Sequence, residues 1–248
     1  MFHFFSKKQF LKDLLEGFVD IHCHILPGID DGAKNINESI ELIKGLVALG
    51  VKEFIPTPHV MQDFYPNTDE SIGSSFEILL DALKTTPLSN IPINPAAEYM
   101  MDNHFEDLLN NENLFTLKGR YVLVEMSYFQ QPINVKAIIF NLKSNGYLPV
   151  LAHPERYSYY HNNKAKYKEL KQLGCFFQLN LLSLSNHYGK SVQETAHYLI
   201  QEEFIDFVGT DTHNINHVKK LSKIVLKKNI VPRISSIIEN TINIFSVT

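Results

Sequence analysis

Six short apolar runs in this chain each end in a histidine or a carboxylate, and this repeated pattern limits the folds that the chain can adopt. Runs of four to eight residues rich in β-branched and aromatic side chains are typical of strands. The polar residues at their ends are His22 with His24, His59, Glu98, Glu125, His153, and Asp211 with His213. Because the C-terminal ends of parallel strands converge on one face of a barrel, we expect these side chains to meet at a single site.

The pair His22 and His24 suggests what that site binds. Alternate residues of a strand point to the same face, so both imidazoles project toward one point, as metal ligands do. A His-x-His pair alone is weak evidence. However, five of the 11 histidines of the chain lie at strand ends of this kind, which favours a metal site over separately packed histidines.

Segments with helical apolar spacing separate the runs. In the first segment Asn35 and Glu38 resemble a capping box, and Gly50 occupies the position of a C-terminal cap. Similar spacing predicts helices at residues 70 to 84, 104 to 111, 134 to 145, 164 to 173, 191 to 203 and 232 to 245. The alternation of strands and helices predicts a parallel sheet. With a further run at residues 175 to 180 there are seven strands, and we expect a distorted (β/α)7 TIM-like barrel.

Length and composition indicate one domain. The chain has 248 residues, of which 44% are hydrophobic, and its composition does not change along the sequence. Lys7, Lys8 and Lys12 interrupt the first segment, so its apolar residues do not form the core of a signal peptide. We expect an N-terminal arm at residues 1 to 17, which covers the barrel or contacts a partner, and a barrel domain at residues 18 to 248.

Composition also excludes several classes of protein. No stretch approaches the ~18 to 20 apolar residues that span a bilayer, so we expect no transmembrane segment. A formal net charge of -4 provides no broad basic surface for nucleic acid. Two cysteines do not make a disulfide framework, which favours a reducing compartment. We therefore expect a cytoplasmic protein that holds any anionic substrate by local contacts.

Longer motifs give the chain a resemblance to a known family. Residues 20 to 32, from Asp20 to Gly32, resemble the opening motif of the polymerase and histidinol phosphatase (PHP) superfamily. Motifs at residues 57 to 59, 97 to 98, 124 to 125, 151 to 157 and 209 to 214 are similar to the remaining motifs of that superfamily, in the same order. Within it, the chain resembles the bacterial manganese-dependent protein-tyrosine phosphatases of the capsule and exopolysaccharide type.

The resemblance implies a site with two or three divalent ions. Carried over by position, the metal ligands are His22, His24, Asp31, His59, Glu98, Glu125, His153, Asp211 and His213. Imidazoles and carboxylates without a thiolate favour Mn²⁺ or Fe²⁺, with Zn²⁺ as a further candidate. The resemblance assigns Glu125 as the carboxylate that bridges two ions, and we therefore count it among the catalytic residues.

Arg156 is the residue that we expect to bind phosphate. Arginine occurs only at positions 120, 156 and 233, and Arg156 lies three residues after His153. A guanidinium group matches two phosphate oxygens in a way that an ammonium group does not. The alternative is a structural ion pair with Glu155 or another carboxylate. Among the loop aromatic residues, Phe64 and Tyr128 are expected to contact the ring of the substrate, although simple packing is an equal alternative.

A cysteine-based mechanism is not expected. Cysteine-dependent tyrosine phosphatases carry an arginine shortly after their His-Cys pair, where this chain has Ile29. The corresponding position after Cys175 is Leu181. Both Cys23 and Cys175 are therefore predicted to be small buried residues.

One position departs from the family pattern. Members of the family carry a further arginine about five residues after the histidine that corresponds to His213, and this chain has Val218 there. His217 and Lys219 are the candidates to replace its contact with phosphate.

Together these features predict a metal-dependent protein-tyrosine phosphatase. We expect a hydroxide generated on the metal ions to attack phosphorus, with Arg156 on the outer phosphate oxygens. The resemblance implies a phosphotyrosine protein as partner, namely the C-terminal tail of a bacterial tyrosine kinase that controls capsule or exopolysaccharide export. Two alternatives stay open: a phosphatase for histidinol phosphate or another small phosphoester, and a metal-binding regulatory module with an impaired site.

Overall fold

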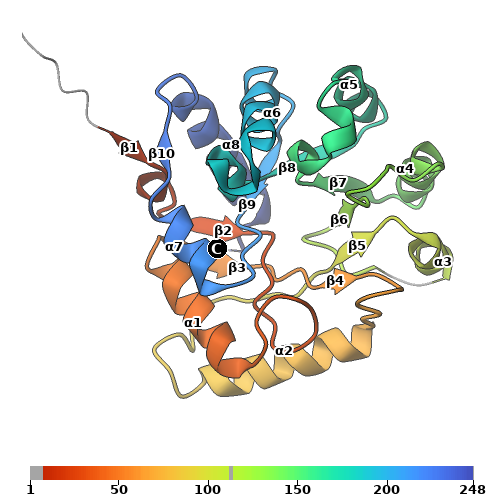
Figure 1. Cartoon of the computed structure of the whole chain (residues 1–248). Helices are drawn as coiled ribbons and strands as arrows, with labels where there is room; N and C mark the ends of the chain where they lie inside the picture. Colours follow the sequence, from red (N-terminus) through yellow and green to blue (C-terminus); the bar gives the residue numbers. More distant parts are fainter. Residues whose placement is uncertain (1–7, 112–113, 248) are drawn as a thin grey trace, which may run out of the picture.

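Parallel strands form the centre of the molecule, and helices surround them (Figure 1). The computed structural model describes residues 8–111 and 114–247. The parallel strands are β2 (Phe18–Asp20), β3 (Val51–Phe54), β4 (His59–Val60), β5 (Glu98–Met100), β6 (Tyr121–Glu125), β7 (Leu148–Ala152), β8 (Phe176–Asn180) and β9 (Phe207–Gly209). They form two sheets, with β2 beside β3 and with β4 to β9 in sequence order.

Hydrogen bonds beyond these ladders close the strands into a barrel. The amide of Asp211 donates to the carbonyl of His22 (2.7 Å), and the amide of His24 donates to the carbonyl of Thr212 (3.1 Å), which joins the end of β9 to β2. The second gap lies between β3 and the six-stranded sheet, and there Phe54 at the end of β3 forms a parallel bridge with Ile93, which precedes β5. The predicted single-domain α/β barrel with parallel strands is therefore confirmed.

The second and third predicted strands differ in detail from the structure. Only residues 51 to 54 of the run at residues 51 to 58 form a strand, β3, and a second piece, β4, begins directly after the run at His59, with Pro56 and Pro58 between the two. The run at residues 93 to 97 contains Pro95 and lies before the paired residues of β5. Proline has no amide N–H to donate to a ladder, which explains both interruptions. Counted as two halves of one strand, β3 and β4 give the predicted seven strands.

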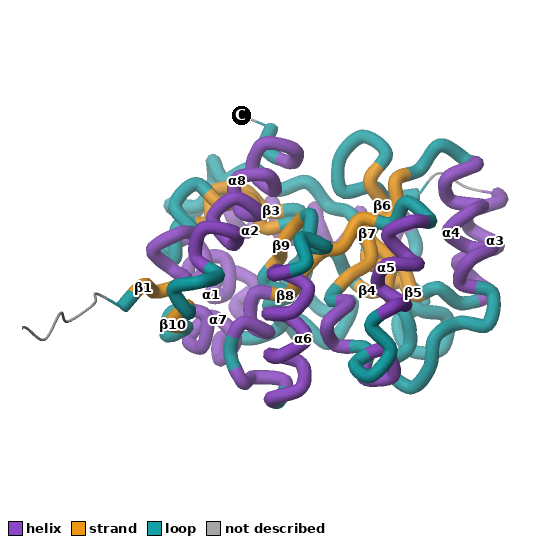
Figure 2. Tube along the Cα trace, turned by 90° about the horizontal axis from the view of Figure 1, so that it is seen from above, coloured by secondary structure: helices purple, strands orange, loops and turns teal. Residues whose placement is uncertain are grey.

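The helices of the outer layer agree with the apolar spacing, with one addition. They are α1 (Ile36–Val47), α2 (Asp69–Leu83), α3 (Asn103–Asn111), α4 (Val135–Ser144), α5 (Ala165–Gln172), α6 (Lys190–Gln201), α7 (Ile215–Leu221) and α8 (Val231–Phe245). In Figure 2, α3 and α4 lie at one end of the molecule, far from β1 (Gln9–Phe10) and β10 (Val225–Leu226). None of the described helices combines the length and the apolar character needed to cross a membrane.

Local contacts explain where α1 begins and ends. The side chain of Asn35 accepts hydrogen bonds from the amides of Asn37 and Glu38, both at 3.1 Å, as predicted for an N-terminal cap. The Glu38 carboxylate accepts from the amide of Lys34 (3.1 Å), one residue earlier than in a capping box. After the helix, Gly50 has a φ of +109°, and a Cβ there would lie 2.5 Å from the carbonyl oxygen of Leu15.

The described part of the N-terminal arm packs against the barrel. Strand β1 pairs with β10 in antiparallel orientation, and Leu11 and Leu15 are fully buried in the main core. Residues 1–7 of the predicted arm lie outside the described residues. Covering of the barrel, one of the two roles expected for the arm, is therefore visible in residues 8–17. The domain boundary at residue 17 stays a prediction.

Helix α7 was not predicted from the sequence. Asn214 caps it by accepting from the amides of Asn216 (3.1 Å) and His217 (3.3 Å). Val218 on this helix is buried beside Gly45 of α1, where a Cβ at position 45 would lie 2.9 Å from Cγ1 of Val218. Seven residues are too few for a clear helical period in the sequence.

Candidate metal centre

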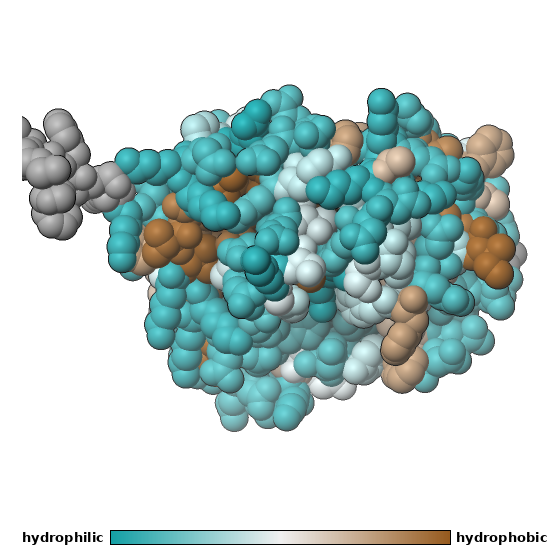
Figure 3. Space-filling model, turned by 45° about the horizontal axis from the view of Figure 1, so that its top comes forward, coloured by the Kyte–Doolittle hydropathy of each residue, from teal (hydrophilic) through white to brown (hydrophobic). Residues whose placement is uncertain are grey.

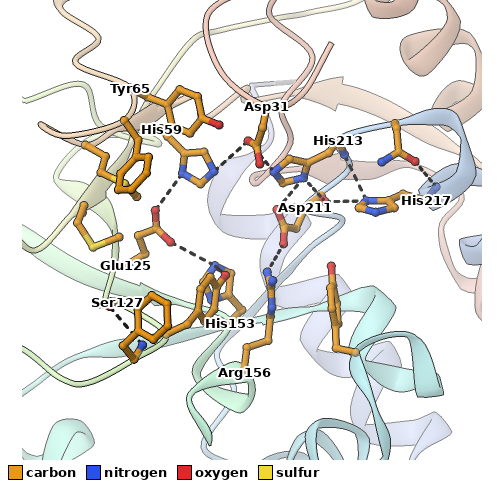
Figure 4. Close-up of a pocket in the computed structure, with 17 residues that line it drawn as sticks. Asp31, His59, Tyr65, Glu125, Ser127, His153, Arg156, Asp211, His213 and His217 are labelled. Carbon is orange, nitrogen blue, oxygen red and sulfur yellow. Dashed lines mark hydrogen bonds and ion pairs between the residues drawn. The ribbon is translucent and has the colours of Figure 1, made fainter. Parts of the chain in front are cut away.

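The predicted ligands lie together at the C-terminal ends of the strands. Figure 4 shows those that line the pocket, namely Asp31, His59, Glu125, His153, Asp211 and His213. They form four groups, and within each group the ligand atoms lie within 4.8 Å of one another. The groups are His24, Asp31, His59 and His213; His22, His24 and Asp211; His22, Glu98 and His153; and His59, Glu98 and Glu125. Neighbouring groups share His22, His24, His59 and Glu98, as expected where ligands serve adjacent ions.

Glu98 is the most central carboxylate of the cluster. Its Oε2 atom lies 3.0 Å from Nδ1 of His59 and 3.3 Å from Nε2 of His22, and its Oε1 atom lies 3.1 Å from Nε2 of His153. Burial opposes its charge, but His22 and His59 hold the pKa of this carboxyl well below its usual range. Glu125, the bridge suggested by the resemblance, lies 2.9 Å from Nδ1 of His59 and 3.9 Å from Nε2 of His153. The geometry thus makes Glu98 as good a bridge as Glu125.

Several polar atoms of the cluster are buried without a hydrogen-bond partner among the described residues. They are Nε2 of His22 and His24, Nδ1 of His59 and His153, Oε2 of Glu98 and Oε1 of Glu125. Most of these atoms face an opposite charge at 2.9 to 3.3 Å without the geometry of a hydrogen bond, as Nδ1 of His59 faces Oε1 of Glu125. Native proteins rarely collect such atoms in one place. Imidazole nitrogens and carboxylate oxygens fit a divalent cation, which would satisfy them together.

Two of the histidines are oriented by buried partners behind them. Nδ1 of His22 lies 2.8 Å from Oε1 of Gln178, and Nδ1 of His24 lies 2.8 Å from Oδ2 of Asp30. Because these oxygens only accept, each Nδ1 carries a proton and each Nε2 faces the cluster. Burial disfavours charge on His24, but Asp30 raises its pKa to about 10. A cation that binds His24 must therefore displace the second proton of the ring.

Sequence reasoning missed Gln178 and Asp30, although both left a signal. Gln178 lies within the apolar run of β8, two residues before Asn180, so two polar side chains share one face of that strand. Asp30 directly precedes the predicted ligand Asp31. Because the resemblance assigned one aspartate of this pair as a ligand, the supporting role of the other was not considered.

The backbone is strained at two of the predicted ligands. His153 has a φ of +35° and Asp211 a φ of +50°, which places both in the left-handed region. Outside glycine such conformations cost of the order of 1 to 3 kcal/mol and concentrate at functional sites. His153 directly follows β7, and Asp211 lies two residues after β9. The left-handed backbone at these positions directs both side chains into the cluster.

Arg156 extends toward the cluster and contacts one predicted ligand (Figure 4). Its Nη1 atom donates to Oδ2 of Asp211 at 2.9 Å. The guanidinium carbon lies 4.6 Å from the ring centre of Tyr128 and 4.2 Å from that of Tyr188, so the two rings flank it. Tyr188 was not among the predicted residues, because its helical turn gave no motif. The ion pair that was considered as an alternative is thus made with Asp211.

Glu155 does not pair with Arg156. It is fully buried, and its Oε1 atom accepts hydrogen bonds from the amide of Asn180 (3.0 Å) and from the hydroxyl of Ser183 (2.6 Å). Burial raises the pKa of Glu155 to about 7. This carboxyl group therefore links the turn after β7 to the end of β8 and does not bind the guanidinium group.

A pocket of about 540 Å³ opens above the cluster, and both polar and apolar side chains line it. The polar ones include predicted ligands, Arg156 and His217. The apolar and aromatic lining residues, which we together call the apolar wall, are Met61, Phe64, Tyr65, Met100, Tyr128, Phe129 and Tyr188. Phe64 is 73% exposed and Phe129 is 95% exposed. The predicted substrate-binding residues Phe64, Tyr128 and Arg156 therefore line one pocket, whose apolar wall suits an aromatic ring.

The structure separates the two candidates for the missing family arginine. His217 lines the pocket, whereas Lys219 does not, and Val218 faces α1. Nδ1 of His217 lies 3.3 Å both from the amide of His213, from which it can accept, and from the carbonyl oxygen of Asp211, to which it can donate. Burial, together with His213, lowers the pKa of His217 to about 4, so its ring is neutral near pH 7. His217 therefore offers a neutral imidazole in place of an arginine.

The cysteines are placed as predicted. Cys23 and Cys175 are both buried and unpaired. Burial raises the pKa of Cys175 to about 12 and that of Cys23 well above its usual range. Thiols of this kind are poor nucleophiles at neutral pH.

Comparisons with known proteins identify relatives along most of the chain. Residues 18–238 match the family model described as capsular polysaccharide synthesis, CpsB/CapC. Tyrosine-protein phosphatase YwqE of Bacillus subtilis is 31% identical over 200 residues, which cover 79% of this chain and 78% of YwqE. Tyrosine-protein phosphatase CpsB of Streptococcus agalactiae is 28% identical over 204 residues, which cover 80% of this chain and 84% of CpsB.

Solved structures agree with these sequence comparisons. A chain from the structures of YwqE from Bacillus subtilis and CpsB from Streptococcus pneumoniae, described as metal-dependent tyrosine phosphatases, matches with a TM-score of 0.80 and 27% identity. The match covers 92% of this chain and 93% of that chain. An amidohydrolase from Mycoplasma synoviae shares the fold alone, with a TM-score of 0.54 and 14% identity over 94% of this chain and 88% of that chain. This chain therefore belongs to the CpsB/CapC family of capsular polysaccharide synthesis proteins.

Proposed function

We propose that this chain is a metal-dependent protein-tyrosine phosphatase that uses two or three divalent ions, with Mn²⁺ as the first candidate. The observation that carries the proposal is the meeting of four overlapping groups of predicted ligands with Arg156 at the base of one pocket. Relatives named tyrosine-protein phosphatases support the substrate class. The apolar wall of the pocket supports an aromatic substrate in particular.

The proposed ligands are His22, His24, Asp31, His59, Glu98, Glu125, His153, Asp211 and His213. Divalent ions held by them would polarise the phosphate and lower the pKa of a coordinated water toward about 7. The protein side chains contribute fixed positions to this chemistry. Gln178 and Asp30 hold two of the imidazoles, and burial of the cluster strengthens every charge interaction within it.

Arg156 binds the outer oxygens of the phosphate in this proposal. One of its nitrogens donates to Asp211, and its other N–H groups remain for the substrate. The rings of Tyr128 and Tyr188 flank the guanidinium plane and limit its motion. Charge that develops on the phosphate in the transition state is then spread over a donor that is already in place.

The other groups of the pocket orient the substrate ring and the leaving group. Phe64 and Tyr128 contact the ring of the substrate in this proposal, while Tyr65 stacks on His59 with ring centres 5.5 Å apart. A phenol leaves with a pKa near 10, so it needs less help from a general acid than an alkyl alcohol does. The neutral ring of His217 lies at the pocket and adds a polar group without a charge.

We further propose that the natural substrate is the phosphotyrosine-bearing C-terminal tail of a bacterial tyrosine kinase that controls capsule or exopolysaccharide export. The described role of the family in capsular polysaccharide synthesis supports this partner. An exposed tail can bring its side chain into the pocket end-on without unfolding a domain.

The test compares the turnover of a phosphotyrosine peptide, a phosphoserine peptide and histidinol phosphate by the protein loaded with Mn²⁺. We expect the phosphotyrosine peptide to react fastest, since phosphoserine carries its phosphate on a shorter side chain and has a poorer leaving group. A clear preference for histidinol phosphate would instead favour the small-phosphoester alternative. A fully metallated protein that turns over none of the three would support the regulatory module.

A further inference from the structure

The catalytic pocket continues into a second cavity on the surface, which we call the side groove. The side groove has a volume of about 660 Å³ and is lined by residues from 100–106 and 127–134. It shares Met100, Ser127 and Phe129 with the catalytic pocket. A polypeptide that places a phosphotyrosine in the pocket therefore meets the side groove within a few residues, because an extended chain advances ~3.3 to 3.6 Å per residue.

Two apolar side chains of the side groove project into solvent. Phe129 is 95% exposed and Ile133 is 98% exposed, and both lie in the loop between β6 and α4. On the face drawn in Figure 3 the surface is mostly hydrophilic, and apolar residues gather in a few separate patches. Burial of apolar surface is favourable, so these two residues offer contact area to a bound segment.

Hydrogen bonds anchor the loop that carries these side chains. The hydroxyl of Tyr159 donates to the carbonyl of Ser127 (3.0 Å), and the hydroxyl of Tyr160 donates to Oε1 of Gln131 (2.6 Å). The side-chain amide of Asn134 donates to Glu106 on α3. The groove is therefore formed before a ligand arrives, which reduces the ordering cost of binding.

The charges that line the side groove limit the kind of peptide segment that can bind there. Asp102 and Glu106 are its charged lining residues, and none of the described lining residues is lysine or arginine. An acidic segment would be repelled, and a neutral or basic segment would be accepted. The phosphate itself is held elsewhere, beside Arg156 in the catalytic pocket.

We propose that the side groove binds the residues that flank the phosphotyrosine of the substrate, and that it favours apolar side chains and rejects acidic ones. This inference rests on the proposed function and adds a specificity to it. Ile133 is a specificity-determining residue in this account, because it lines the side groove but not the catalytic pocket.

The experiment uses Ile133→Ser and a matched control, Phe140→Ser. Phe140 is also an exposed apolar residue (69%), on α4, but it does not line the side groove. Both variants and the parent protein are loaded with Mn²⁺ and assayed with 4-nitrophenyl phosphate. They are also assayed with two nine-residue peptides whose central phosphotyrosine is flanked by leucine and lysine in one peptide and by glutamate in the other.

The parent protein should have a kcat/KM about tenfold higher for the leucine and lysine peptide than for the glutamate peptide. A factor of this size is expected when one peptide buries an aliphatic side chain and the other does not. Ile133→Ser should reduce that preference through KM, leaving the part that the charges of Asp102 and Glu106 contribute, and it should leave turnover of 4-nitrophenyl phosphate unchanged. Phe140→Ser should change neither. Equal turnover of the two peptides by the parent protein would overturn the side groove while leaving the phosphatase intact. No turnover of any substrate would instead count against the proposed function.

A second copy of the chain is the competing occupant, and sedimentation distinguishes it. If the parent protein is a dimer and Ile133→Ser makes it a monomer, the exposed residues belong to an interface between copies, and the proposal of a substrate groove is wrong. A parent protein and variant with the same mass keep the substrate as the occupant.

Discussion

The two ends of the barrel bury different kinds of side chain. At the C-terminal ends of the strands lie the predicted ligands, with polar atoms that lack hydrogen-bond partners among the described residues. A separate cluster of apolar side chains, which includes Val19, Leu123, Val150, Phe207 and Phe245, packs within the fold. Leu123 and Glu125 lie two residues apart on β6 and so face the same way. Strand β6 thus contributes one side chain to the apolar cluster and another to the proposed metal site.

The largest effect is expected from a change at the ligand end. His24→Ala should lower turnover by more than about 100-fold, because even partners behind a metal ligand typically matter 10- to 100-fold. Metal content should fall as well, while circular dichroism should stay that of the folded barrel, since the apolar clusters are untouched. Global unfolding of His24→Ala would show that the cluster is mainly structural.

The matched change in the apolar cluster is Leu123→Ala. It should lower the free energy of unfolding by ~2 to 5 kcal/mol, because Leu123 is fully buried and the change leaves a cavity. Metal content and turnover of the folded fraction should stay close to those of the parent protein. The free energy of unfolding is measured with denaturant, and the metal content is measured on the same samples. If Leu123→Ala lost metal without losing stability, the two ends of the barrel would not have separate roles.

A smaller effect is expected behind the ligands. Asp30→Asn retains the shape of the side chain but removes the charge that faces Nδ1 of His24, so the affinity for Mn²⁺ should fall ~10- to 100-fold. Titration of activity against free Mn²⁺ measures it, and the exposed Asp63→Asn serves as the control. An unchanged Mn²⁺ dependence in Asp30→Asn would mean that His24 does not depend on this partner.

The smallest effect concerns the substrate rather than the metals. Arg156→Lys retains the positive charge but loses the paired N–H groups, so kcat/KM should fall about tenfold or more, which is roughly 1.4 kcal/mol. Metal content should not change. The control is Arg233→Lys, which should have no effect because Arg233 does not line the pocket. Loss of metal in Arg156→Lys would assign this residue to the cluster itself.

The sequence predicted the barrel and the cluster because both depend on strand ends. Apolar runs that end in histidines and carboxylates located most of the residues of the cluster, and the resemblance added Asp31. Features that depend on contacts between distant segments were not predicted. The pairing of His22 with Gln178 joins residues 156 positions apart, and the aromatic pair around Arg156 brings Tyr188 from a turn without a motif. Helix α7 was missed because its stability depends on the cap at Asn214 and on packing against α1.

The most direct test of the account is the metal content of the purified protein, measured together with turnover of 4-nitrophenyl phosphate. The four overlapping ligand groups predict more than one divalent ion per chain. Chelation should abolish turnover, and Mn²⁺ should restore it. A protein that retains full turnover after all metal has been removed would contradict the account.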